Sequence, residues 1–556
     1  MHRRGNSTRR QFVAATGASA AVIGLSGCVG SSDEDIPDDY EPVSFELNTF
    51  TRDDLADVFG SAEIITDQWE EKLGADIEFT PTPIPEAVDL MTQGDYDMHT
   101  NGFSGTLSRV DPEGLLRSYT SWATGILPLF ENEDYDDAYT RLRQETEFEE
   151  RQQAAFECQE IILNELPVIP TYHRNSIAIL YRHHFENWLT SPGPSPHWHR
   201  YSLENVVRID DDRAAMIYAD DTHPPSLNPL AIGTGIEMNS AMPTHETLVT
   251  IHPETGEIES ALAETFEIVD NETFEFTIRE GATFHDGESV TGEDVKFTVE
   301  YYQEWNGAPS YAEDYSVVDD VEVIDERSVR ISLEEPNTPW LSNSASRFNI
   351  LPKHVWENVV EDHGLEHPTE YSGDDMMIGC GPFEHVFEES DERIIWEPYD
   401  DHPMEVDFDE LIWLSHGTVA SIIGNLGSGT ADFSEVGGFS PSHADDAEDN
   451  DDLEVIESED FSYQTIYINP DRRPFDNVEV RRAFAHAVDM QEVIAVVFQG
   501  RAEPVRSPIA HHVDAVSDWH NPDVAVYDGG EAEARRILEE EGFMWGSSGQ
   551  LYMPPE

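Results

Sequence analysis

Residues 272–295 read ETFEFTIREGATFHDGESVTGEDV and place a strand signal, a turn-rich connection and a helix start in one stretch. Apolar side chains alternate with polar ones at Phe274, Phe276 and Ile278, which predicts a half-buried strand. The connection that follows is rich in turn residues, and Thr291 then begins a helical pattern that runs to about residue 305. This order of elements indicates a fold that mixes helices and sheet.

The flanks of this stretch add further strands. Residues 264–269 carry the same alternation, and the turn signal at Asp270-Asn271 joins them to the first strand as a hairpin. Residues 321–333 hold another pair of strand signals. We therefore expect residues 246–375 to form a small α+β subdomain.

The N-terminal part of the chain alternates between short strands and helices. Residues 43–47 and 77–79 predict strands, and the segment between them predicts a helix over 62–73. Four residues of this segment recur at helical spacing: Ala62, Ile65, Trp69 and Leu73. Such alternation is typical of α/β architecture.

Two segments share the order helix, Gly-x-x-Asp, apolar strand. The first ends its helix before Gly94 and Asp97, and the second before Gly429 and Asp432. Glycine ends a helix with a positive φ, and aspartate can tie the turn that follows. The two helices are expected over residues 85–91 and 419–426. The repetition suggests two similarly built α/β lobes.

The chain of 556 residues has 31 Lys and Arg against 114 Asp and Glu, which gives a net charge of −83. A general nucleic-acid binder is excluded, because such a protein needs cationic surface against phosphate. Only Lys72, Lys296 and Lys353 are lysines, and the acids are spread along the chain. Such a surface suits molar salt, where the screening length falls to about 3 Å. We interpret it as halophilic adaptation, with an acidic ligand-binding surface as the alternative.

The N-terminus has the layout of an export signal, with a basic start and an apolar segment too short to span a membrane. Residues 8–13 resemble a twin-arginine motif, and residues 25–28 resemble a lipobox. The motifs imply that residues 1–27 are a signal peptide, and that Cys28 is lipidated and anchors the protein on the extracellular face of the membrane. Residues 28–42 are polar and acidic and are expected to form a solvated tether.

Several segments also resemble the extracellular solute-binding proteins of family 5, the oligopeptide-, dipeptide- and nickel-binding components of ABC importers. The matching segments are residues 226–230, 246–249, 274–299, 379–383 and 469–489. Together with the acidic composition, they resemble a haloarchaeal type. The resemblance implies a two-lobed, periplasmic-binding-protein-like α/β fold with a hinge and an extra α+β subdomain. It implies binding without catalysis, with an ABC permease and ATPase as partners.

The order of the segments differs from that of the family. The part resembling residues 43–209 comes last in the family but first here, and the chain ends where the family would continue into Val43. We interpret this as a circular permutation, in which the old ends near Val207 and Ala214 are joined through residues 210–212. An artefact of sequencing or gene fusion is the alternative.

The resemblance also implies where the lobes divide. One lobe is expected to comprise residues 43–170 and 463–556. The other is expected to comprise residues 171–245 and 376–462, and it carries the α+β subdomain. A peptide or another small solute would be captured between the lobes, which close around it as a hinge.

By resemblance, Arg52 aligns with an arginine that pairs with the ligand carboxylate. A guanidinium group suits this role because it can donate two parallel hydrogen bonds to a carboxylate. Thr106 stands where dipeptide binders place an aspartate against the peptide amino group. Asp111 or Asp97 could replace that aspartate only if the loop differs. We therefore expect a longer or amino-blocked peptide, or another carboxylate-bearing solute, and not a free dipeptide.

Other candidate ligand contacts are less specific. Phe103, Trp122 and Tyr467 could form apolar walls of the site, with core packing as the alternative. Cys380 stands in a Gly-x-Gly-Pro-aromatic turn where the family commonly has threonine, and is a further candidate. A small buried thiol is the alternative for Cys380, as it is for Cys158.

No cofactor or metal site is predicted. The 22 histidines form only short clusters, at residues 183–184, 197–199 and 511–512, and adjacent histidines in a strand point to opposite faces. Nickel transport is therefore a minor alternative. A secreted hydrolase is another, but the sequence has no GxSxG, HExxH, P-loop or GxGxxG motif.

Overall fold

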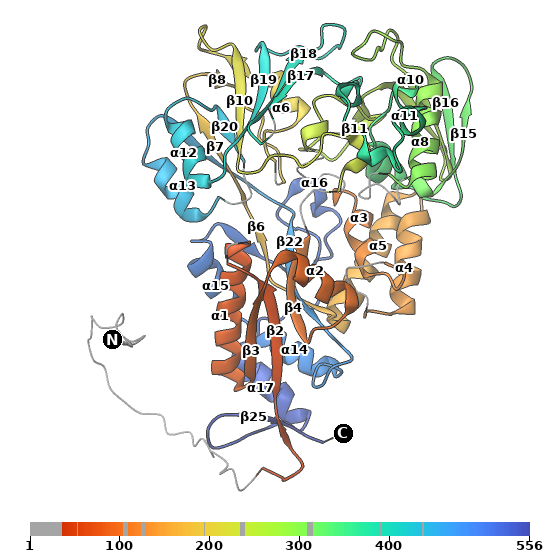
Figure 1. Ribbon diagram of the computed structural model, residues 1–556. Helices are drawn as coiled ribbons and strands as arrows, with labels where there is room; N and C mark the ends of the chain where they lie inside the picture. The colour runs from red at the N-terminus through yellow and green to blue at the C-terminus, as the bar shows by residue number, and fades with distance from the viewer. Residues whose placement is uncertain are drawn as a thin grey trace.

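In the computed structural model, two sheets of different size mark two lobes, which lie one above the other in Figure 1. The structure describes residues 36–52, 54–103, 109–123, 129–193, 195–233, 239–307, 315–389, 391–435 and 439–555. Within these residues no helix is both long and apolar enough to cross a membrane. The predicted signal peptide, Cys28 and Thr106 lie outside them.

The lower lobe is built on a five-stranded sheet of order β3-β2-β4-β22-β5. Its strands are β2 (Ser44–Phe50), β3 (Asp76–Thr82), β4 (Met98–Phe103), β5 (Val168–Pro170) and β22 (Tyr463–Ile468). β2 runs parallel to β3 and β4, whereas β22 is antiparallel to β4 and β5. Strands from both ends of the chain therefore form one sheet.

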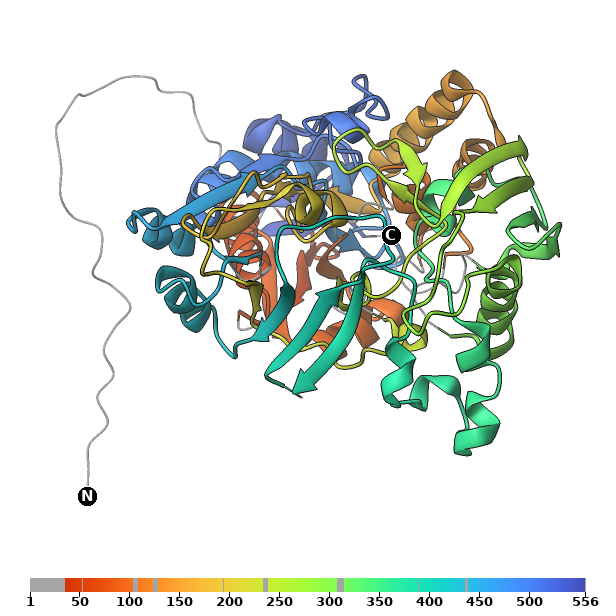
Figure 2. The ribbon, with the colours of Figure 1, turned by 90° about the horizontal axis from the view of Figure 1, so that it is seen from above.

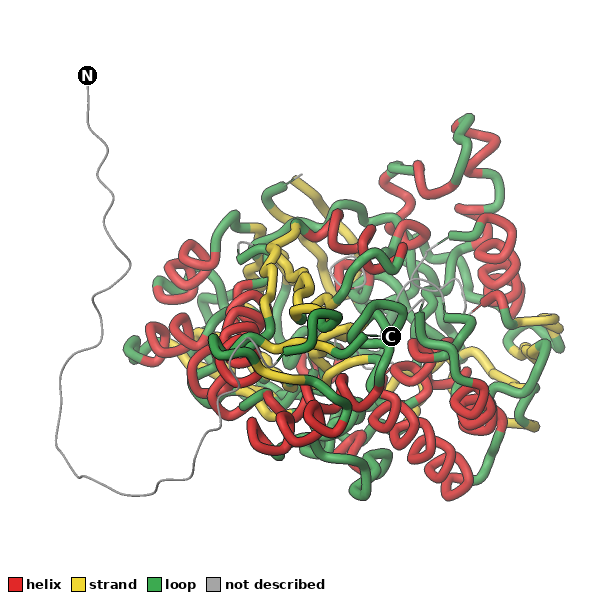
Figure 3. The backbone as a smooth tube through the Cα atoms, turned by 90° about the horizontal axis from the view of Figure 1, so that it is seen from below, coloured by secondary structure: helices red, strands yellow, loops and turns green. Residues whose placement is uncertain are grey.

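Helices cover this sheet on both faces, as the view from below shows (Figure 3). One face packs against α1 (Ala56–Leu73), α14 (Val478–Ala487), α15 (Met490–Val497) and α17 (Gly530–Glu540). The other packs against α2 (Ile84–Gln93), α4 (Glu133–Gln144) and α5 (Phe148–Glu165). Each face has its own apolar core, because side chains alternate across a strand.

The helix predicted over residues 62–73 is confirmed as α1, and its four apolar residues are buried. α1 begins six residues earlier than predicted, at Ala56. The backbone N–H groups of Asp54 and Leu55 donate to the Thr51 carbonyl and form a turn that leads into the helix. Val58 is also buried and extends the apolar stripe by one turn.

The upper lobe contains a seven-stranded sheet of order β17-β18-β19-β10-β20-β7-β21. Its strands are β7 (Ser176–Tyr181), β10 (Ala215–Asp220), β17 (Phe383–Glu389), β18 (Arg393–Pro398), β19 (Glu410–Ser415), β20 (Phe433–Ser434) and β21 (Leu453–Ser458). Central β10 is parallel to both of its neighbours. The helices α6 (Arg200–Asn205), α12 (Val419–Gly427) and α13 (Pro441–Glu448) belong to this lobe.

The subdomain lies beside the seven-stranded sheet, as the view from above shows (Figure 2). Its sheet has the order β13-β14-β16-β15. The strands are β13 (Ala263–Asp270), β14 (Thr273–Ile278), β15 (Val318–Val323) and β16 (Ser328–Leu333), with the short β11 (Val249–Ile251) and β12 (Ile258–Ser260) nearby. The helices are α8 (Gly292–Trp305), α10 (Lys353–Trp356) and α11 (Val359–His363). The predicted hairpin, helix and strand pair are confirmed, and Thr291 caps α8 in a capping box with Asp294.

Two segments cross between the lobes. The first runs from β5 through β6 (Tyr172–Arg174) into β7, and the second runs from β21 into β22. β6 pairs with β23 (Ala502–Pro504) of the lower lobe. The His173 imidazole is hydrogen-bonded with the Ser462 carbonyl at 2.6 Å, and this contact joins the two crossings. Two lobes on two crossings is the arrangement of a hinge.

The start of the described chain lies against its end. β1 (Glu41–Pro42) pairs with β25 (Leu551–Met553), which also pairs with β24 (Met544–Trp545). The Val43 N–H donates to the Leu551 carbonyl at 2.9 Å, and the Leu551 N–H donates to the Gly74 carbonyl at 2.8 Å. The proximity that the permutation predicts for these two regions is therefore found.

Candidate functional site

The lower lobe meets the subdomain along its helical edge. Glu113 of α3 (Glu113–Leu116) is buried, and its carboxylate accepts hydrogen bonds from the Tyr139 hydroxyl and from the Asn343 side-chain amide of the subdomain. Close by, Arg143 forms an ion pair of 2.8 Å with Glu335. These contacts bring the two bodies together beside the crossings.

Aromatic side chains gather at the upper end of the lower sheet. Phe103 and Tyr463 stack with centroids 5.9 Å apart and an angle of 8°, and Tyr119 lies 6.1 Å from Phe103. The Asn101 amide donates to the Tyr467 hydroxyl at 3.0 Å. Phe103 lies opposite Tyr463 and Tyr467 lies opposite His99, so the two predicted residues are at different ends of the β4–β22 pair, and both are buried in the same apolar core.

Arg109 lies against this aromatic group. The Arg109 guanidinium lies 5.3 Å from the centroid of the Phe103 ring, and Arg109 itself is half-buried. The pKa of Arg109 is lowered to about 10, mainly by burial and also by the positive charges of Arg347 and Arg117, whereas Tyr467 and Asp460 oppose the shift. Arg347 belongs to the subdomain, where its guanidinium donates to the Asn343 carbonyl at 3.5 Å.

A shallow hollow lies beside this group, between α1 and the end of the sheet. It is lined by Val58, Ser61, Ala62, Ile65, Thr100, Asn101, Thr171, Tyr172, Gln464, Thr465 and Ile466. Asn101 lines the hollow and also contacts Tyr467. Thr171 belongs to the first crossing, so the hollow borders both the aromatic group and the hinge.

Arg52 lies apart from the aromatic group. Its guanidinium forms an ion pair of 3.2 Å with Glu63 and lies 4.3 Å from the centroid of the Phe59 ring, both on α1. The Arg52 side chain is 59% exposed. Because the chain has 114 acidic residues against 31 basic ones, an exposed arginine commonly has a carboxylate nearby with which to form an ion pair. Among the described residues the structure does not bring Arg52 together with Phe103 or Tyr467.

The two aspartates considered as partners for an amino group are both engaged. Asp111 accepts two hydrogen bonds from one guanidinium nitrogen of Arg151, at 2.8 and 2.9 Å, and both side chains are 10% exposed. Asp97 accepts a hydrogen bond of 3.0 Å from the Glu46 N–H. Both carboxylates therefore hold the fold of the lower lobe.

Trp122 and Cys380 also lie outside the group around Phe103. Trp122 is 53% exposed and contacts Tyr139 edge to face. Cys380 and Cys158 are buried, free thiols, and burial raises the pKa of each. In the turn around Cys380, a side chain at Gly379 would collide with the Thr244 carbonyl. The turn thus packs against backbone, which explains its glycines.

A chain of histidines lies at the crossings. The rings of His173 and His512 are 5.0 Å apart, those of His512 and His511 5.5 Å, and those of His511 and His520 5.3 Å. Burial lowers the pKa of all four, that of His173 to about 3. Across the described residues, no three His, Cys, Asp or Glu side chains are arranged to hold a metal ion.

Sequence reasoning missed Arg109, Arg117 and Arg347. A local signal existed for the first two, because a chain with few cations places them within eight residues, just after the apolar strand β4. Arg347 is distant in sequence, and nothing near it points to the lower lobe. Its position follows only from the packing of the subdomain.

The family model described as "Bacterial extracellular solute-binding proteins, family 5 Middle" matches residues 257–555, more than half of the chain. The chain belongs to this family. The resemblance to family 5 is therefore confirmed, and so is the two-lobed α/β fold with its added subdomain.

Individual relatives are more distant. The chain is 24% identical over 362 residues to heme-binding protein A of Haemophilus influenzae and 24% identical over 363 residues to the dipeptide-binding protein of Escherichia coli. Each match covers 61% of this chain and 64% or 65% of the relative. The oligopeptide-binding protein AppA of Bacillus subtilis, solved with a nonapeptide, is 20% identical with a TM-score of 0.48, over 62% of this chain and 68% of AppA.

Proposed function

We propose that this protein captures a small solute between its two lobes and delivers it to an ABC importer. The observation that carries the proposal is the fold itself, in which two crossings join two lobes, and Phe103, Tyr467 and Arg109 of the lower lobe are its candidate contacts. A solute enclosed between the lobes stabilises the closed arrangement by its differential affinity. Family membership supports binding without catalysis. The lobe boundaries are proposed after residue 170 and before residue 463.

Titration calorimetry in high salt, with solutes identified by mass spectrometry of the purified protein, tests this function. We expect saturable heat and recovery of an unchanged solute. Release of a new product from the bound compound would instead favour the secreted hydrolase. Thr106 stays a proposed ligand contact, and its replacement by aspartate should strengthen binding of free dipeptides, because it supplies a countercharge for the amino group.

We further propose that the protein is exported by the twin-arginine route and anchored through a lipid on Cys28. The basis is the pair of motifs at residues 8–13 and 25–28. Intact-mass analysis of membrane-bound protein should show a chain that begins at Cys28 and carries at least two acyl-type chains, since one alone holds a protein only marginally. A soluble chain that retains Met1 would contradict the anchor.

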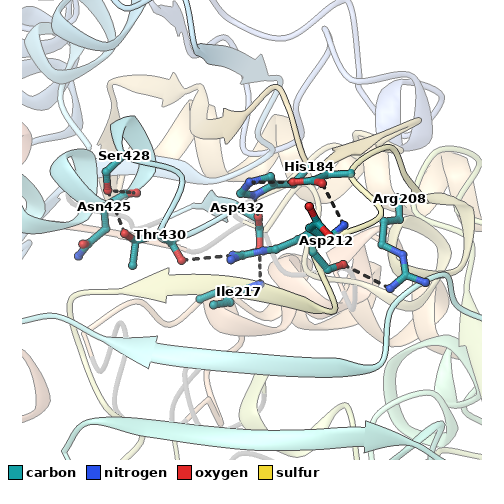
Figure 4. Close-up of polar contacts among 10 residues, drawn as sticks. His184, Arg208, Asp212, Ile217, Asn425, Ser428, Thr430 and Asp432 are labelled. Atoms are coloured by element: carbon teal, nitrogen blue, oxygen red, sulfur yellow. Dashed lines mark hydrogen bonds and ion pairs between the residues drawn. The ribbon is translucent and has the colours of Figure 1, made fainter.

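The circular permutation is likewise a proposal, and two observations support it. Residues 44–181 precede the part of the chain that the family model matches, residues 257–555. They nevertheless supply strands to both of the large sheets, as a segment moved from elsewhere in the family order would. The joint is also well bound: Arg208 donates to the Arg213 carbonyl at 3.3 Å, and Arg213 forms an ion pair of 2.6 Å with Asp432 (Figure 4).

A reordered chain tests the permutation. It begins at Ala214, continues from Pro554 into Val43 and ends at Val207. It should fold with a similar melting temperature, because the same contacts are available. A control chain cut inside α1, at Ile65, should not fold. Failure of the first chain together with success of the second would contradict the permutation.

The acidic surface supports the proposal of halophilic adaptation. Carboxylates repel one another across a surface with few cations, and the screening length grows from about 3 Å at 1 M salt to about 10 Å at 0.1 M. The melting temperature should therefore fall steeply on desalting. A flat salt profile would remove this interpretation.

A further inference from the structure

The subdomain touches the lower lobe at three places. Its β11–β12 turn holds Gly256, with φ of 70°, so close to the lower lobe that a Cβ atom there would lie 2.5 Å from the Val110 side chain. The turn between β13 and β14 and the segment 335–343 reach the end of α4 and the start of α3. In Figure 1, α4 lies beneath the subdomain at the right, to one side of the crossing strand β6.

The subdomain completes the C-terminal end of α4. The last carbonyl groups of a helix have no partner inside the helix and need one outside it. The Arg143 carbonyl accepts from the Thr338 N–H of the subdomain at 2.9 Å. The Gln144 carbonyl accepts from the Asn271 side-chain amide of the subdomain at 3.1 Å. The last two carbonyls of this lower-lobe helix therefore take their donors from the subdomain.

A buried carboxylate strengthens the same contact. Glu113 of the lower lobe is 5% exposed and accepts from the Asn343 amide of the subdomain and from the Tyr139 hydroxyl of its own lobe. A carboxylate that has lost its hydration needs such donors. One turn after Tyr139, Arg143 also forms an ion pair of 2.8 Å with Glu335, whose side chain is 54% exposed. An ion pair this open to water adds little, so the hydrogen bonds dominate the contact.

The contact is polar, and within the described residues no apolar core continues across it. The core of the subdomain is formed by residues of the segment 230–380. The facing core of the lower lobe is formed by residues of the segments 50–168 and 461–516, and the two cores share no residue. Water can replace polar partners at small net cost, so these two bodies can separate without exposing either core.

We propose that the subdomain is a latch on the lower lobe, made by the contacts of Asn271, Thr338 and Asn343, and that this latch holds the two lobes closed. Contacts to one side of the crossings separate when the lobes turn about them. The strength of the latch therefore sets the proportion of open and closed molecules. This goes beyond the proposed function, since it governs how readily the lobes open to any solute.

A contact at the crossings behaves differently. The Arg501 carbonyl of the lower lobe accepts from the Asn175 N–H, which follows β6, at 3.4 Å. The Arg501 side chain forms an ion pair of 2.6 Å with Glu457 of the upper lobe. Because this contact lies where the lobes are joined, we expect it to persist when they turn, whereas the latch breaks.

Hydrogen exchange of the full chain in high salt, read by mass spectrometry at residue resolution, tests the latch. The Thr338 N–H donates across the contact, whereas the neighbouring Asn337 N–H donates to the Asn271 carbonyl inside the subdomain at 2.9 Å. These are the only two amides between Pro336 and Pro339, which have no N–H. We expect a lower protection factor for Thr338, because its amide meets water whenever the lobes open. Equal protection of both amides would overturn the latch, since the contact would then open only when the subdomain unfolds.

Substitutions then locate the effect. Asn343→Ala should lower the protection factor of Thr338 by roughly ten- to a hundredfold, because it removes a donor to a buried carboxylate. Asn271→Ala removes a hydrogen bond to a neutral carbonyl and should lower it by about three- to tenfold. Asn358→Ala is the matched control and should change nothing, because Asn358 is an exposed asparagine of the subdomain whose side chain does not cap α11. Equal effects of Asn343→Ala and Asn358→Ala would overturn the proposal.

A second readout separates lobe opening from misfolding. The double variant Asn271→Ala with Asn343→Ala should have a larger radius of gyration than wild type in small-angle X-ray scattering, because more of its molecules are open. The protection factor of Asn337 should stay unchanged in this variant. An unchanged radius would overturn the latch, and so would an equal loss of protection at Asn337 and Thr338, which would assign the two asparagines a purely structural role. Neither measurement uses a solute, so a failure of the proposed function would not alter the result.

Discussion

The two Gly-x-x-Asp turns occupy equivalent places in the two lobes. In the lower lobe α2 ends at Gly94, with φ of 65°, and in the upper lobe α12 is followed by Gly429, with φ of 70°. Asp97 then accepts a hydrogen bond of 3.0 Å from the N–H of Glu46 in β2, and Asp432 accepts one of 2.6 Å from an N–H of β10. In both lobes the aspartate ties the turn to the neighbouring parallel strand.

The surroundings of the two carboxylates differ. Asp432 is fully buried and contacts Arg213 and His184, each at 2.6 Å (Figure 4). Asp97 is half-buried, and in the described chain no ion pair of its carboxylate is found. A carboxylate left near water needs only hydrogen bonds, whereas a buried one needs a countercharge. The same local motif therefore occurs in two environments. Only the fully buried Asp432 is paired with an arginine, Arg213.

The two turns should differ most in how much free energy of unfolding is lost when the aspartate is replaced by asparagine. Asp432→Asn should lower the free energy of unfolding by about 3–5 kcal/mol, because it leaves the charge of Arg213 without its buried partner. Asp97→Asn removes a charge-assisted acceptor near water and should cost only about 1 kcal/mol. Denaturant unfolding in high salt measures both.

The control is the double variant Asp432→Asn with Arg213→Gln. It should recover part of the stability lost in the single variant, because the uncompensated cation is gone. Equal losses for Asp97→Asn and Asp432→Asn would show that burial does not set the difference between the two turns.

The free energy of unfolding should fall in acid, because a buried histidine of the first crossing, His173, must take up a proton. The pKa of buried His173 is lowered to about 3, against 6.5 for an unfolded chain, so below pH 6.5 the unfolded state binds more protons. The contribution of His173 to the free energy of unfolding is therefore fully present above pH 6.5 and is lost as the pH falls toward 3. At pH 5 the loss from His173 should be about 2 kcal/mol.

His173→Gln should flatten this part of the pH profile, measured by denaturant unfolding between pH 7 and pH 5. Glutamine retains a polar group for the Ser462 carbonyl but cannot titrate. His183→Gln is the control, because that histidine is exposed and pairs with Asp452 at the surface. An unchanged slope in His173→Gln would assign the acid sensitivity to other groups.

Local patterns predicted most of the fold. The alternation at Phe274 and Phe276 and the helical spacing from Ala62 to Leu73 are short-range signals, and the structure confirms each as strand or helix. Each such pattern needs only one apolar face to bury, so tertiary packing did not override it. The start of α1 was missed, because its first turn depends on hydrogen bonds to Thr51 and not on periodicity.

The candidate site could be predicted only in part. Phe103 and Tyr467 stay predicted contacts: they lie on the paired strands β4 and β22, and both are buried in the apolar core of the lower lobe. Arg109 and Arg347 are more than two hundred residues apart in sequence, and no local pattern predicts that Arg347 affects the pKa of Arg109. Asp111 was considered as a ligand contact because it is a polar loop residue. In the structure its carboxylate is paired with Arg151 and stabilises the lower lobe.

The smallest expected effect compares the glycines of the two turns. Alanine at Gly94 or Gly429 must adopt a left-handed conformation, which costs about 1–2 kcal/mol for a residue with a Cβ atom. At Gly94 the new methyl group would lie 3.1 Å from the Leu129 side chain, which can move aside. At Gly429 it would lie 2.9 Å from the Tyr181 ring, which packs 4.5 Å from His184 beside the buried Asp432. Gly429→Ala should therefore be the more destabilising of the two in denaturant unfolding. The reverse order would mean that the network around Asp432 tolerates displacement better than the apolar packing around Leu129 does.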